Sequence, residues 1–442
     1  MADYAEGRLG EAVRPGARPI AKRIIALFVA SLRGGGAPRQ TVTLANAFAA
    51  RGHVVHLVVI QPKGSLQRAV SPRVRLVRLE SWLLRLPLVR SIRRLQVVAS
   101  VPALIGYLRV ERPDVLLAAA SHVHRAAVWA RLLARTDTRL VLRASNHLSG
   151  SAWNTKRWPR PLLPVFARLC YPWADGVIAI SDGIARDLSR VTGIPCERIA
   201  VIPNPVVTPE LEEKARASLD HPWYRPGQPP VVLGVGRLAT AKDFPTLLCA
   251  FARLRARRLI RLIILGEGKR RRALTALAKQ LGIADDCELP GWVDNPCPYM
   301  AHSAVFVLSS AWEGLPGALI EAMACGCPVV STDCPSGPAE ILEGGVYGPL
   351  VPVGDAAALA KAIESVLGSP PERERLRARA RYYSADRAAE QYLEVLLGVA
   401  GTPPSHELAA GAVWPKLGGS PTGNATSVRP QPGARVGVLC SW

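Results

Sequence analysis

The stretch IIALFVASLRGGGAPRQTVTLANAFAARGHVVHLVVI, residues 24–60, decides the fold of this chain. It begins with an apolar run at 24–32, continues through a glycine-rich loop and an amphipathic helical segment, and ends in a second apolar run at 53–60. Strands with continuous apolar runs are typically buried on both faces, and a helix between two such strands is a crossover connection. This order therefore predicts a βαβ unit in a parallel sheet.

The same alternation of apolar runs and helical periods recurs along the chain. Further strand candidates occur at 114–120, 139–145, 176–181, 199–206, 231–238, 259–268, 286–292, 304–310, 327–333 and 348–353. The stretch DHPWYRPGQPP at 220–230, rich in proline and glycine, separates two sets of strands and marks a domain boundary. The last helix is predicted from about Arg373 to Leu397. We therefore predict an α/β protein of two doubly wound, Rossmann-like domains that face an interdomain cleft.

Composition and pattern divide the chain into five parts. Residues 1–21 form a leader that we expect to be flexible, and 22–205 and 206–385 form the two Rossmann-like domains. A helix at 386–400 is expected to pack back on the first domain. Residues 401–442 are rich in Pro, Gly and Ser without apolar periodicity, so we expect disorder there.

The chain has a large and uneven positive charge. Its formal net charge is +22, which indicates an anionic partner such as nucleic acid, an acidic membrane surface or a phosphorylated substrate. Between Lys22 and Pro113 only Glu80 and Glu111 are acidic. Within that region, the segment 81–110 mixes arginines with large apolar residues. This pattern fits a basic amphipathic surface on anionic lipid, and equally fits helices that cover the first sheet.

Cysteine usage and apolar runs bear on the compartment. The nine cysteines are odd in number and contain no CxxC, so neither a disulfide framework nor a zinc site is indicated. The N-terminus lacks the pattern of a secretory signal, and no uncharged apolar run approaches the roughly 18 residues that span a bilayer. We expect a cytoplasmic protein, with peripheral association with the inner face of the cell membrane left open.

The stretch AWEGLPGALIEAMACGCPVV at 311–330 holds the first candidate site residues. Leu-Pro-Gly interrupts any helix, so a helix should begin near Pro316 or Gly317. Glu313 then lies on the loop before the helix, and Glu321 lies on the helix. Carboxylates accept hydrogen bonds from vicinal diols, and the amides at a helix N-terminus bind anions. This arrangement suits a nucleotide sugar, with a carboxylate at each sugar and the diphosphate between them.

A second candidate group supplies positive charge. The stretch GVGRLATAKDF at 234–244 places Arg237 and Lys242 directly after a strand, where two cations can hold a diphosphate and neutralise its charge as it leaves. The same stretch fits the loose dinucleotide pattern GxGxxG/A, which raises an oxidoreductase as a rival, although these two cations crowd the place that the pattern reserves for small residues. No Asp-x-Asp occurs, so we predict no metal.

Several motifs carry a family resemblance. The chain contains GVGRLATAKDFPTLL, LGEG, LPGW and SSAWEGLPGALIEAMACGCPVVSTDCPSGPAEIL in this order. They resemble the C-terminal half of the retaining glycosyltransferases of family 4, which have the GT-B fold. Glu313 and Glu321 match the E-x7-E motif of that family, and the resemblance covers roughly residues 22–398.

The resemblance implies roles for residues in both domains. In the second domain, which would bind a nucleotide sugar, the catalytic candidates are Arg237, Lys242 and Glu313, and the donor-binding candidates are Glu321, Gly314, Leu315, Pro316, Gly317, Leu289 and Trp292. Arg237 and Lys242 would contact the diphosphate, Glu313 the sugar and Glu321 the ribose. In the first domain, which would bind the acceptor, the candidates are Gly34, Gly35 and Gly36 near the donor phosphates and Arg143, Asn146 and His147 near the transferred sugar.

The resemblance also implies a reaction. A hexose or N-acetylhexosamine would pass, with retention of configuration and without a protein base, from a UDP-linked donor to a saccharide or lipid-linked saccharide acceptor in cell-surface polysaccharide or glycolipid synthesis. The expected partners are thus these two substrates and an anionic membrane surface. The alternatives are a catalytically inactive GT-B protein and a basic nucleic-acid-binding protein; aromatic residues make up only 6% of the chain, which disfavours the second.

Overall fold

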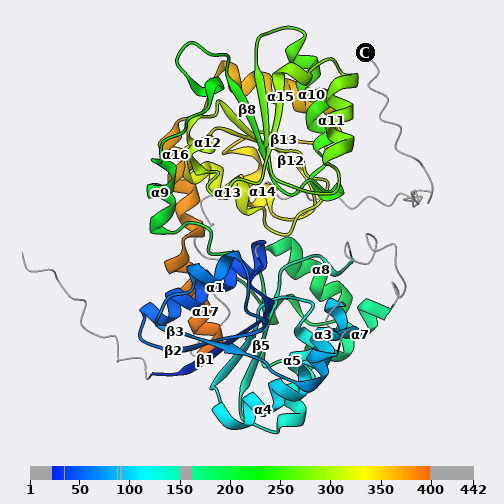
Figure 1. Ribbon diagram of the computed structural model, residues 1–442, viewed down its shortest axis with the longest axis vertical. Coiled ribbons are helices and arrows are strands. Elements are labelled where there is room, and N and C mark those ends of the chain that lie inside the picture. Colours follow the sequence, from blue (N-terminus) through cyan, green and yellow to red (C-terminus); the bar gives the residue numbers. More distant parts are fainter. Residues whose placement is uncertain (1–21, 34, 87, 90–91, 150–161, 399–442) are drawn as a thin grey trace, which may run out of the picture.

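The computed structural model describes residues 22–33, 35–86, 88–89, 92–149 and 162–398 (Figure 1). The predicted leader at 1–21, Gly34 and the predicted tail at 401–442 lie outside the described residues. Two α/β domains follow each other along the chain, each built on its own parallel sheet. The predicted fold class is therefore confirmed.

Both sheets consist of parallel strands with crossover connections. The first has the order β3-β2-β1-β4-β5-β6-β7, from β1 Ile24–Ser31, β2 Val54–Gln61, β3 Val74–Arg78, β4 Val115–Ala118, β5 Arg139–Ala144, β6 Gly176–Ala179 and β7 Ile199–Val201. The second has the order β10-β9-β8-β11-β12-β13, from β8 Val231–Val235, β9 Arg261–Leu265, β10 Cys287–Gly291, β11 Val305–Leu308, β12 Val329–Thr332 and β13 Leu350–Val351.

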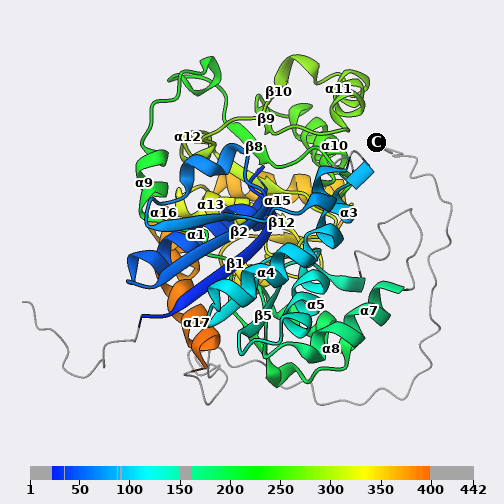
Figure 2. The same ribbon diagram turned by 60° about the horizontal axis from the view of Figure 1, so that its bottom comes forward.

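The described helices cover both faces of the two sheets (Figures 1 and 2). Those of the first domain are α1 Gly36–Ala50, α3 Arg93–Ala99, α4 Val101–Glu111, α5 His124–Ala134, α7 Leu162–Cys170 and α8 Asp182–Thr192. Those that follow are α9 Pro209–Ala215, α10 Phe244–Arg255, α11 Arg271–Gln280, α12 Cys297–His302, α13 Gly317–Ala324, α14 Pro338–Ile341, α15 Ala356–Gly368, α16 Arg373–Ala380 and α17 Ala385–Leu397.

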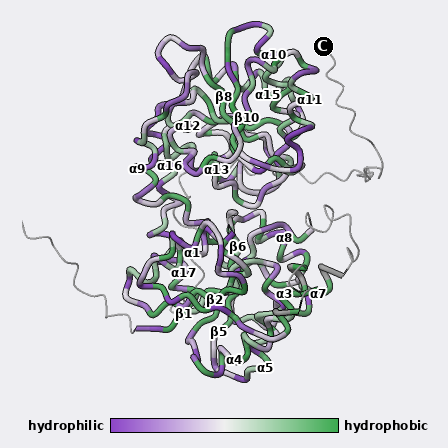
Figure 3. The backbone as a smooth tube through the Cα atoms, viewed as in Figure 1, coloured by the Kyte–Doolittle hydropathy of each residue, from purple (hydrophilic) through white to green (hydrophobic). Residues whose placement is uncertain are grey.

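Strand β1 shows why the first sheet is buried on both sides. Successive side chains of a strand point to opposite faces. Ile25 and Leu27 pack in the core beneath α1 and α17, whereas Ala26 and Phe28 pack in the core beneath α3, α4, α5 and α7. An uninterrupted apolar run is the sequence form of this two-sided burial. Figure 3 shows the corresponding hydrophobic segments in both domains.

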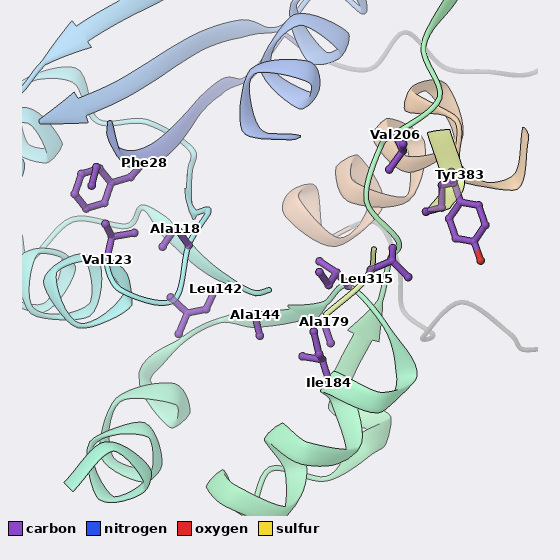
Figure 4. Close-up of a cluster of buried hydrophobic side chains, with 14 of the residues drawn as sticks. Phe28, Ala118, Val123, Leu142, Ala144, Ala179, Ile184, Val206, Leu315 and Tyr383 are labelled. Carbon is purple, nitrogen blue, oxygen red and sulfur yellow. The ribbon is translucent and has the colours of Figure 1, made fainter. Parts of the chain in front are cut away.

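The hydrophobic core continues across the boundary between the domains. Ala179 and Ile184 of the first domain belong to the same buried cluster as Leu315 of the second domain. Figure 4 shows Leu315 next to these two side chains. The loop before α13 is therefore packed against the first domain rather than held in solvent.

The expected single helix from Arg373 to Leu397 is wrong, because two helices occupy it. Between α16 and α17 the carbonyl oxygen of Tyr383 accepts hydrogen bonds from the backbone N–H groups of Val206 and Val207, both at 3.0 Å. Ser384 then caps α17 with its side chain. These bonds replace the helical ones, so the chain turns here and α17 packs on the first sheet.

Two further predictions concern local structure. The predicted start of the helix after Leu-Pro-Gly is confirmed, since α13 begins at Gly317 with Pro316 as its N-cap. The strand β3 was missed. Its sequence, VRLVR, was interpreted only as part of a basic region, although Val74 and Leu76 alternate with Arg75 in the period-2 pattern of an edge strand.

The strand orders fix where loops can form a site. The order reverses between β1 and β4 in the first sheet and between β8 and β11 in the second. In open α/β sheets, ligands bind beyond the carboxyl ends of the strands at such reversal points. The glycine loop after β1, the loop at 236–243 after β8 and the loop at 309–316 after β11 occupy these positions.

Candidate active site

Lys242 and Glu313 form the centre of the candidate site. They come from the loops after the neighbouring strands β8 and β11, and Lys242 Nζ donates to Glu313 Oε1 at 2.6 Å. The same oxygen accepts from Ser310 Oγ at 2.6 Å. The two side chains are only 19% and 15% exposed, so water screens this ion pair weakly. The sequence placed both residues in the site, but only the fold shows that they contact each other.

Glycines allow the loops around this ion pair to pack closely against each other. A Cβ on Gly236 would lie 2.9 Å from Lys242 Cε, so the lysine side chain packs closely against the backbone of this loop. The glycines of LGEG act in the same way. A Cβ on Gly266 would lie 2.0 Å from the carbonyl oxygen of Gly236, and one on Gly268 would lie 2.3 Å from that of Leu238. The loop after β9 therefore packs directly beneath the loop that carries the cations.

Arg237 lies on the same loop as Lys242 but differs from it in burial and in contacts. Its side chain is exposed, whereas that of Lys242 is largely buried. Within the part of the chain that the structure describes, the Arg237 guanidinium forms no ion pair or hydrogen bond. Arg237 thus offers a cation that an anionic ligand can take without breaking an internal contact.

The residues that open α13 lie against the first domain. Leu315 is buried, Pro316 is the N-cap of the helix, and Gly317 is its first residue. A Cβ on Gly314 would lie 2.6 Å from the carbonyl oxygen of Ser145, which belongs to the loop after β5. Gly314 therefore allows the backbones of the two domains to approach each other beside the Lys242–Glu313 pair.

Glu321 lies one turn into α13 and faces a cation of the first domain. Arg39 of α1 places Nη1 3.5 Å from Glu321 Oε1, and the Glu321 side chain is 18% exposed. Burial raises the pKa of Glu321, while the charges of Arg39, Lys214 and Lys242 oppose that rise. The sequence predicted Glu321 but missed Arg39. The available signal was a cation in the first turn after the glycine loop.

His147 connects the loop after β5 to the second domain. Its Nε2 lies 2.7 Å from Ser336 Oγ, and its Nδ1 lies 3.5 Å from Asp187 Oδ2. Asp187 also accepts from the backbone N–H groups of Leu148 at 2.7 Å and Ser149 at 3.2 Å. Burial alone would raise the pKa of Asp187. Its contacts with His147 and Ser149 outweigh burial and hold that pKa well below its usual range.

A second interdomain contact lies at the start of α8. The carboxylate of Glu340 accepts from the backbone N–H groups of Asp182 and Gly183, both at 3.0 Å. Two donors and the positive end of the helix favour the ionised form, whereas burial raises the pKa of Glu340 and prevails. A Cβ on Gly183 would lie 2.3 Å from Ser336 Cβ. Neither Ser336 nor Glu340 was among the predicted site residues, because no local pattern shows that they face the first domain.

Arg143 does not occupy the position expected of an acceptor contact. Its side chain is completely buried, and it donates to the carbonyl oxygen of Ala119 at 3.2 Å and to Asn204 Oδ1 at 2.5 Å. Its place at the end of a central strand turns the guanidinium into the protein, where it holds the segment that leads to the second domain. Asn146, three residues later, is exposed on the loop.

The remaining predicted residues lie around this centre. Gly35 adopts φ +100° and caps α1 without a side chain, and a Cβ on Gly35 or Gly36 would meet no atom within 4 Å. In β10 the carbonyl oxygen of Leu289 accepts from Arg271 at 2.8 Å. Trp292 is 62% exposed, and its ring N–H donates to Asp294 at 2.9 Å. The structure therefore does not enclose Trp292 against other side chains.

Sequence comparisons decide the family. Residues 34–209 match the pattern described as Glycosyltransferase Family 4, and residues 217–383 match that described as Glycosyl transferases group 1. The chain is 32% identical over 373 residues to the lipopolysaccharide core biosynthesis glycosyltransferase LpsE of Rhizobium meliloti, covering 82% of this chain and 96% of the relative. The chain belongs to the family 4 glycosyltransferases.

Two more comparisons extend this result. The glycosyltransferase is 28% identical over 380 residues to an N-acetylgalactosamine-N,N'-diacetylbacillosaminyl-diphospho-undecaprenol 4-alpha-N-acetylgalactosaminyltransferase of Campylobacter jejuni, covering 85% of this chain and 99% of the relative. Its fold matches the crystal structure of Anabaena Alr3699/HepE in complex with UDP and glucose, with a TM-score of 0.68 and 20% identity over 85% of this chain and 100% of the other. The family and the GT-B fold expected from the motifs are confirmed.

The first domain of the glycosyltransferase contains a pocket at the ends of β2 and β3. It has a volume of about 420 Å³ and is lined by Ile60, Gln61, Arg78, Leu79, Glu80, Ser81, Leu84 and Gln96. Gln61 Nε2 donates to Gln96 Oε1 at 2.8 Å. The strands β1, β2 and β3 are parallel and adjacent. The pocket therefore lies beyond the same, carboxyl-terminal ends of the strands as the glycine loop after β1. Sequence analysis did not predict this pocket.

Replacing Asp187 by asparagine should destabilise the glycosyltransferase by about 2–4 kcal/mol at pH 7, because the loop at 145–149 loses the buried negative charge and one of the two oxygens that accept its hydrogen bonds. The pKa of Asp187 is depressed in the folded state. The stabilisation is therefore fully present above its ordinary pKa of about 4 and is lost as the pH falls towards the folded value. Urea unfolding of wild type and variant between pH 7 and about pH 3 should show their difference shrinking with acidity.

The control for this measurement is Asp220→Asn, which changes a carboxylate whose side chain is 97% exposed. Its free energy of unfolding should stay within about 0.5 kcal/mol of wild type. A difference between wild type and Asp187→Asn that does not change with pH would contradict the prediction.

Proposed function

We propose that this glycosyltransferase moves a hexose or N-acetylhexosamine from a UDP-sugar to a saccharide or lipid-linked saccharide in the synthesis of cell-surface polysaccharide or glycolipid. The observation on which this rests is the Lys242–Glu313 pair, which the loops after β8 and β11 bring together close to the start of α13. It combines a cation for a diphosphate, a carboxylate for sugar hydroxyls and free helix amides within one small region.

The proposed donor site assigns a task to each of these groups. Lys242 and the exposed Arg237 neutralise the diphosphate, and Glu313 accepts hydrogen bonds from the sugar. Glu321, with Arg39 opposite, lies one turn further along α13 and accepts from the ribose. Donor binding exchanges the contact of Lys242 with Glu313 for contacts with phosphate and sugar. The complex of the structural relative with UDP supports uridine as the nucleoside.

The proposed transfer retains the configuration of the sugar. The bond between the anomeric carbon and the diphosphate oxygen breaks, and a bond to the acceptor oxygen forms on the same face. The acceptor proton passes to the departing phosphate oxygen, so no protein base takes part. Lys242, Arg237 and the amides at the start of α13 stabilise the charge of the leaving diphosphate. These fixed cations take the role for which other enzymes use a metal ion.

We propose that the acceptor binds in the pocket at the ends of β2 and β3. The carboxamides of Gln61 and Gln96 can donate to and accept from sugar hydroxyls, and Arg78 can contact a phosphate. The Campylobacter jejuni relative supports a lipid-linked acceptor, since its name specifies a saccharide on diphospho-undecaprenol. Such an acceptor places the reaction on the cytoplasmic face of a membrane.

One assay tests the proposed reaction. The purified protein is incubated with a panel of nucleotide sugars, with and without membrane lipid extract, and released nucleotide and glycosylated lipid are measured. We expect release of UDP that depends on the extract and persists in EDTA. Activity that disappears with EDTA and returns with magnesium would overturn metal independence. Absence of turnover with every donor, or salt-sensitive binding to nucleic acid instead, would favour an inactive or nucleic-acid-binding protein.

Gln61→Ala tests the acceptor pocket. The variant should raise the KM for acceptor about ten-fold, because one hydrogen-bonding group is lost, while the KM for donor and kcat stay within about two-fold of wild type. The matched control is Gln67→Ala, which removes an exposed carboxamide from the turn Ser65–Ala69. A change in the KM for donor with an unchanged KM for acceptor would contradict the assignment.

A further inference from the structure

Two buried hydroxyl groups lie behind the Lys242–Glu313 pair. They belong to Ser309, which is 1% exposed, and to Thr332, which is completely buried. Ser309 directly follows β11, and Thr332 is the last residue of β12. Because β8, β11 and β12 are adjacent parallel strands, both hydroxyls lie at the carboxyl-terminal end of the sheet, beside the loops that carry the pair. Neither residue is among those to which the proposed donor site assigns a contact with the ligand.

Ser309 holds the backbone of Lys242. Its hydroxyl donates to the carbonyl oxygen of Lys242 at 2.8 Å. On the other side, the backbone N–H of Lys242 donates to the carbonyl oxygen of Ala239 at 3.1 Å. The next residue, Asp243, has a φ of 41°, in the left-handed region that residues other than glycine rarely adopt. Such a conformation persists only where its surroundings hold it, and the bond from Ser309 provides part of that restraint.

Thr332 restrains Glu313 through Ser310. The Thr332 hydroxyl donates to the carbonyl oxygen of Ser310 at 2.6 Å, with that of Leu308 also within reach at 3.3 Å. Ser310 is completely buried, and its own hydroxyl donates to Glu313 Oε1 at 2.6 Å. A fixed backbone at Ser310 therefore fixes the donor that orients the Glu313 carboxylate.

The two hydroxyl bonds differ from the ion pair in how donor binding affects them. In the proposed reaction the donor takes both members of the pair, since Lys242 meets the diphosphate and Glu313 meets the sugar. Their mutual contact of 2.6 Å then no longer orients either side chain. The bonds from Ser309 and Thr332 end on backbone carbonyls instead, so they remain when the pair separates.

We propose that Ser309 and Thr332 are positioning residues for the transfer reaction, one for each member of the Lys242–Glu313 pair. Ser309 holds Lys242 in place for the leaving diphosphate. Thr332, through Ser310, holds Glu313 in place for the transferred sugar. Catalysis by fixed charges requires their placement to within about 0.5 Å, so loss of a restraint lowers kcat more than it weakens donor binding. This inference deepens the proposed function and rests on it for the reaction.

Two substitutions that each remove a hydroxyl test the proposal. Ser309→Ala and Thr332→Val should each lower kcat for UDP release about ten-fold or more, while the KM for donor stays within about three-fold of wild type. Thr332→Ser keeps the hydroxyl and loses a methyl group, so its kcat should stay within about three-fold of wild type. A kcat that falls further in Thr332→Ser than in Thr332→Val would overturn the assignment of Thr332.

The matched controls are Ser303→Ala and Thr192→Val. Ser303 lies buried before the amino-terminal end of β11, and its hydroxyl donates to the carbonyl oxygen of Tyr299 at 2.6 Å. Thr192 lies buried at the end of α8 and donates to that of Leu188 at 2.7 Å.

Each control removes the same kind of buried hydrogen bond as its test variant, so the midpoints of urea unfolding should fall by similar amounts. The kcat of each control should stay within about two-fold of wild type. An equal loss of kcat in test and control variants would indicate a purely structural role. That result, or wild-type kcat in Ser309→Ala and Thr332→Val, would overturn the proposal.

Combined variants test whether each hydroxyl acts through its partner. In the Lys242→Met background, Ser309→Ala should change kcat by less than about two-fold, because the side chain that it positions is absent. Thr332→Val should have an equally small effect in the Glu313→Ala background. A radiolabelled donor gives the sensitivity that these slow variants require. A further loss of about ten-fold in either background would refute the role of that hydroxyl.

A measurement without turnover separates this inference from the proposed function. With isotope-labelled lysine, the NMR signal of the Lys242 Cε–H groups is assigned by its absence in Lys242→Met. It should shift or broaden in Ser309→Ala and Thr332→Val and stay unchanged in Ser303→Ala. No release of UDP by wild type would refute the proposed reaction. A Lys242 signal that is the same in wild type and both test variants would refute the positioning, whether or not the enzyme turns over.

Discussion

Replacing Glu313 by alanine is expected to lower kcat/KM for the nucleotide sugar about a thousand-fold, because the transferred sugar loses the carboxylate that positions it and Lys242 loses its fixed orientation. The fold should survive, since the residue lies on a loop and Ser310 can rotate its hydroxyl. Initial rates of UDP release measure the activity, and circular dichroism with urea unfolding measures the folded state.

The control for Glu313 is Glu343→Ala. The Glu343 side chain is 48% exposed and forms an ion pair with Arg379 at 2.8 Å, and this pair includes none of the proposed donor-site residues. Its loss should leave kcat/KM within about three-fold of wild type, because a paired surface carboxylate contributes little beyond local stability. Wild-type turnover by Glu313→Ala, or an equal loss in both variants, would remove Glu313 from the site.

Replacing Lys242 by methionine is expected to reduce kcat about a thousand-fold and also to destabilise the protein by about 1–3 kcal/mol. The activity is lost because the leaving diphosphate keeps its charge. The stability is lost because Glu313, only 15% exposed, remains without its cation. Steady-state kinetics and urea unfolding measure the two effects on the same preparation.

Comparing Arg237→Met with Lys242→Met separates the effect of a cation on activity from its effect on stability. The Arg237 guanidinium is exposed and, among the described residues, unpaired, so its loss should leave the free energy of unfolding within about 0.5 kcal/mol of wild type. Its kcat/KM should nevertheless fall about a hundred-fold, since Arg237 would contact the donor only when the donor is bound. Full activity of Arg237→Met, or activity of Lys242→Met that magnesium restores, would contradict the proposed role of fixed cations.

Much of the site could be predicted because its signals are local. The helix start at Gly317 follows from Leu-Pro-Gly, since proline and glycine impose their backbone preferences within a few residues. The positions of Arg237 and Lys242 after a strand follow from an apolar run that ends in a glycine turn. These features are determined by residues that are close together in the sequence, so the sequence alone is enough to predict them.

Arg39 and Glu340 could not be predicted, because their roles depend on the opposite domain. Arg39 approaches a carboxylate 282 positions away in the chain, and Glu340 caps a helix 158 positions away. Arg143 was predicted as a site residue, but the structure buries it. Its loop has the pattern of an exposed strand end, but the packing of β5 between two neighbours turns its side chain into the core.

The sequence by itself determined the two parallel sheets, the family and the residue types that can hold a diphosphate and a sugar. These follow from periodicity and short motifs, whose physical causes act between neighbours in the chain. Only the tertiary structure decided that Lys242 is paired while the Arg237 side chain has no partner among the described residues, and that the first domain reaches α13 through Arg39 and Ser145. These contacts depend on which surfaces, far apart in the sequence, pack together. That packing is determined by the free energy of burying apolar side chains throughout the core.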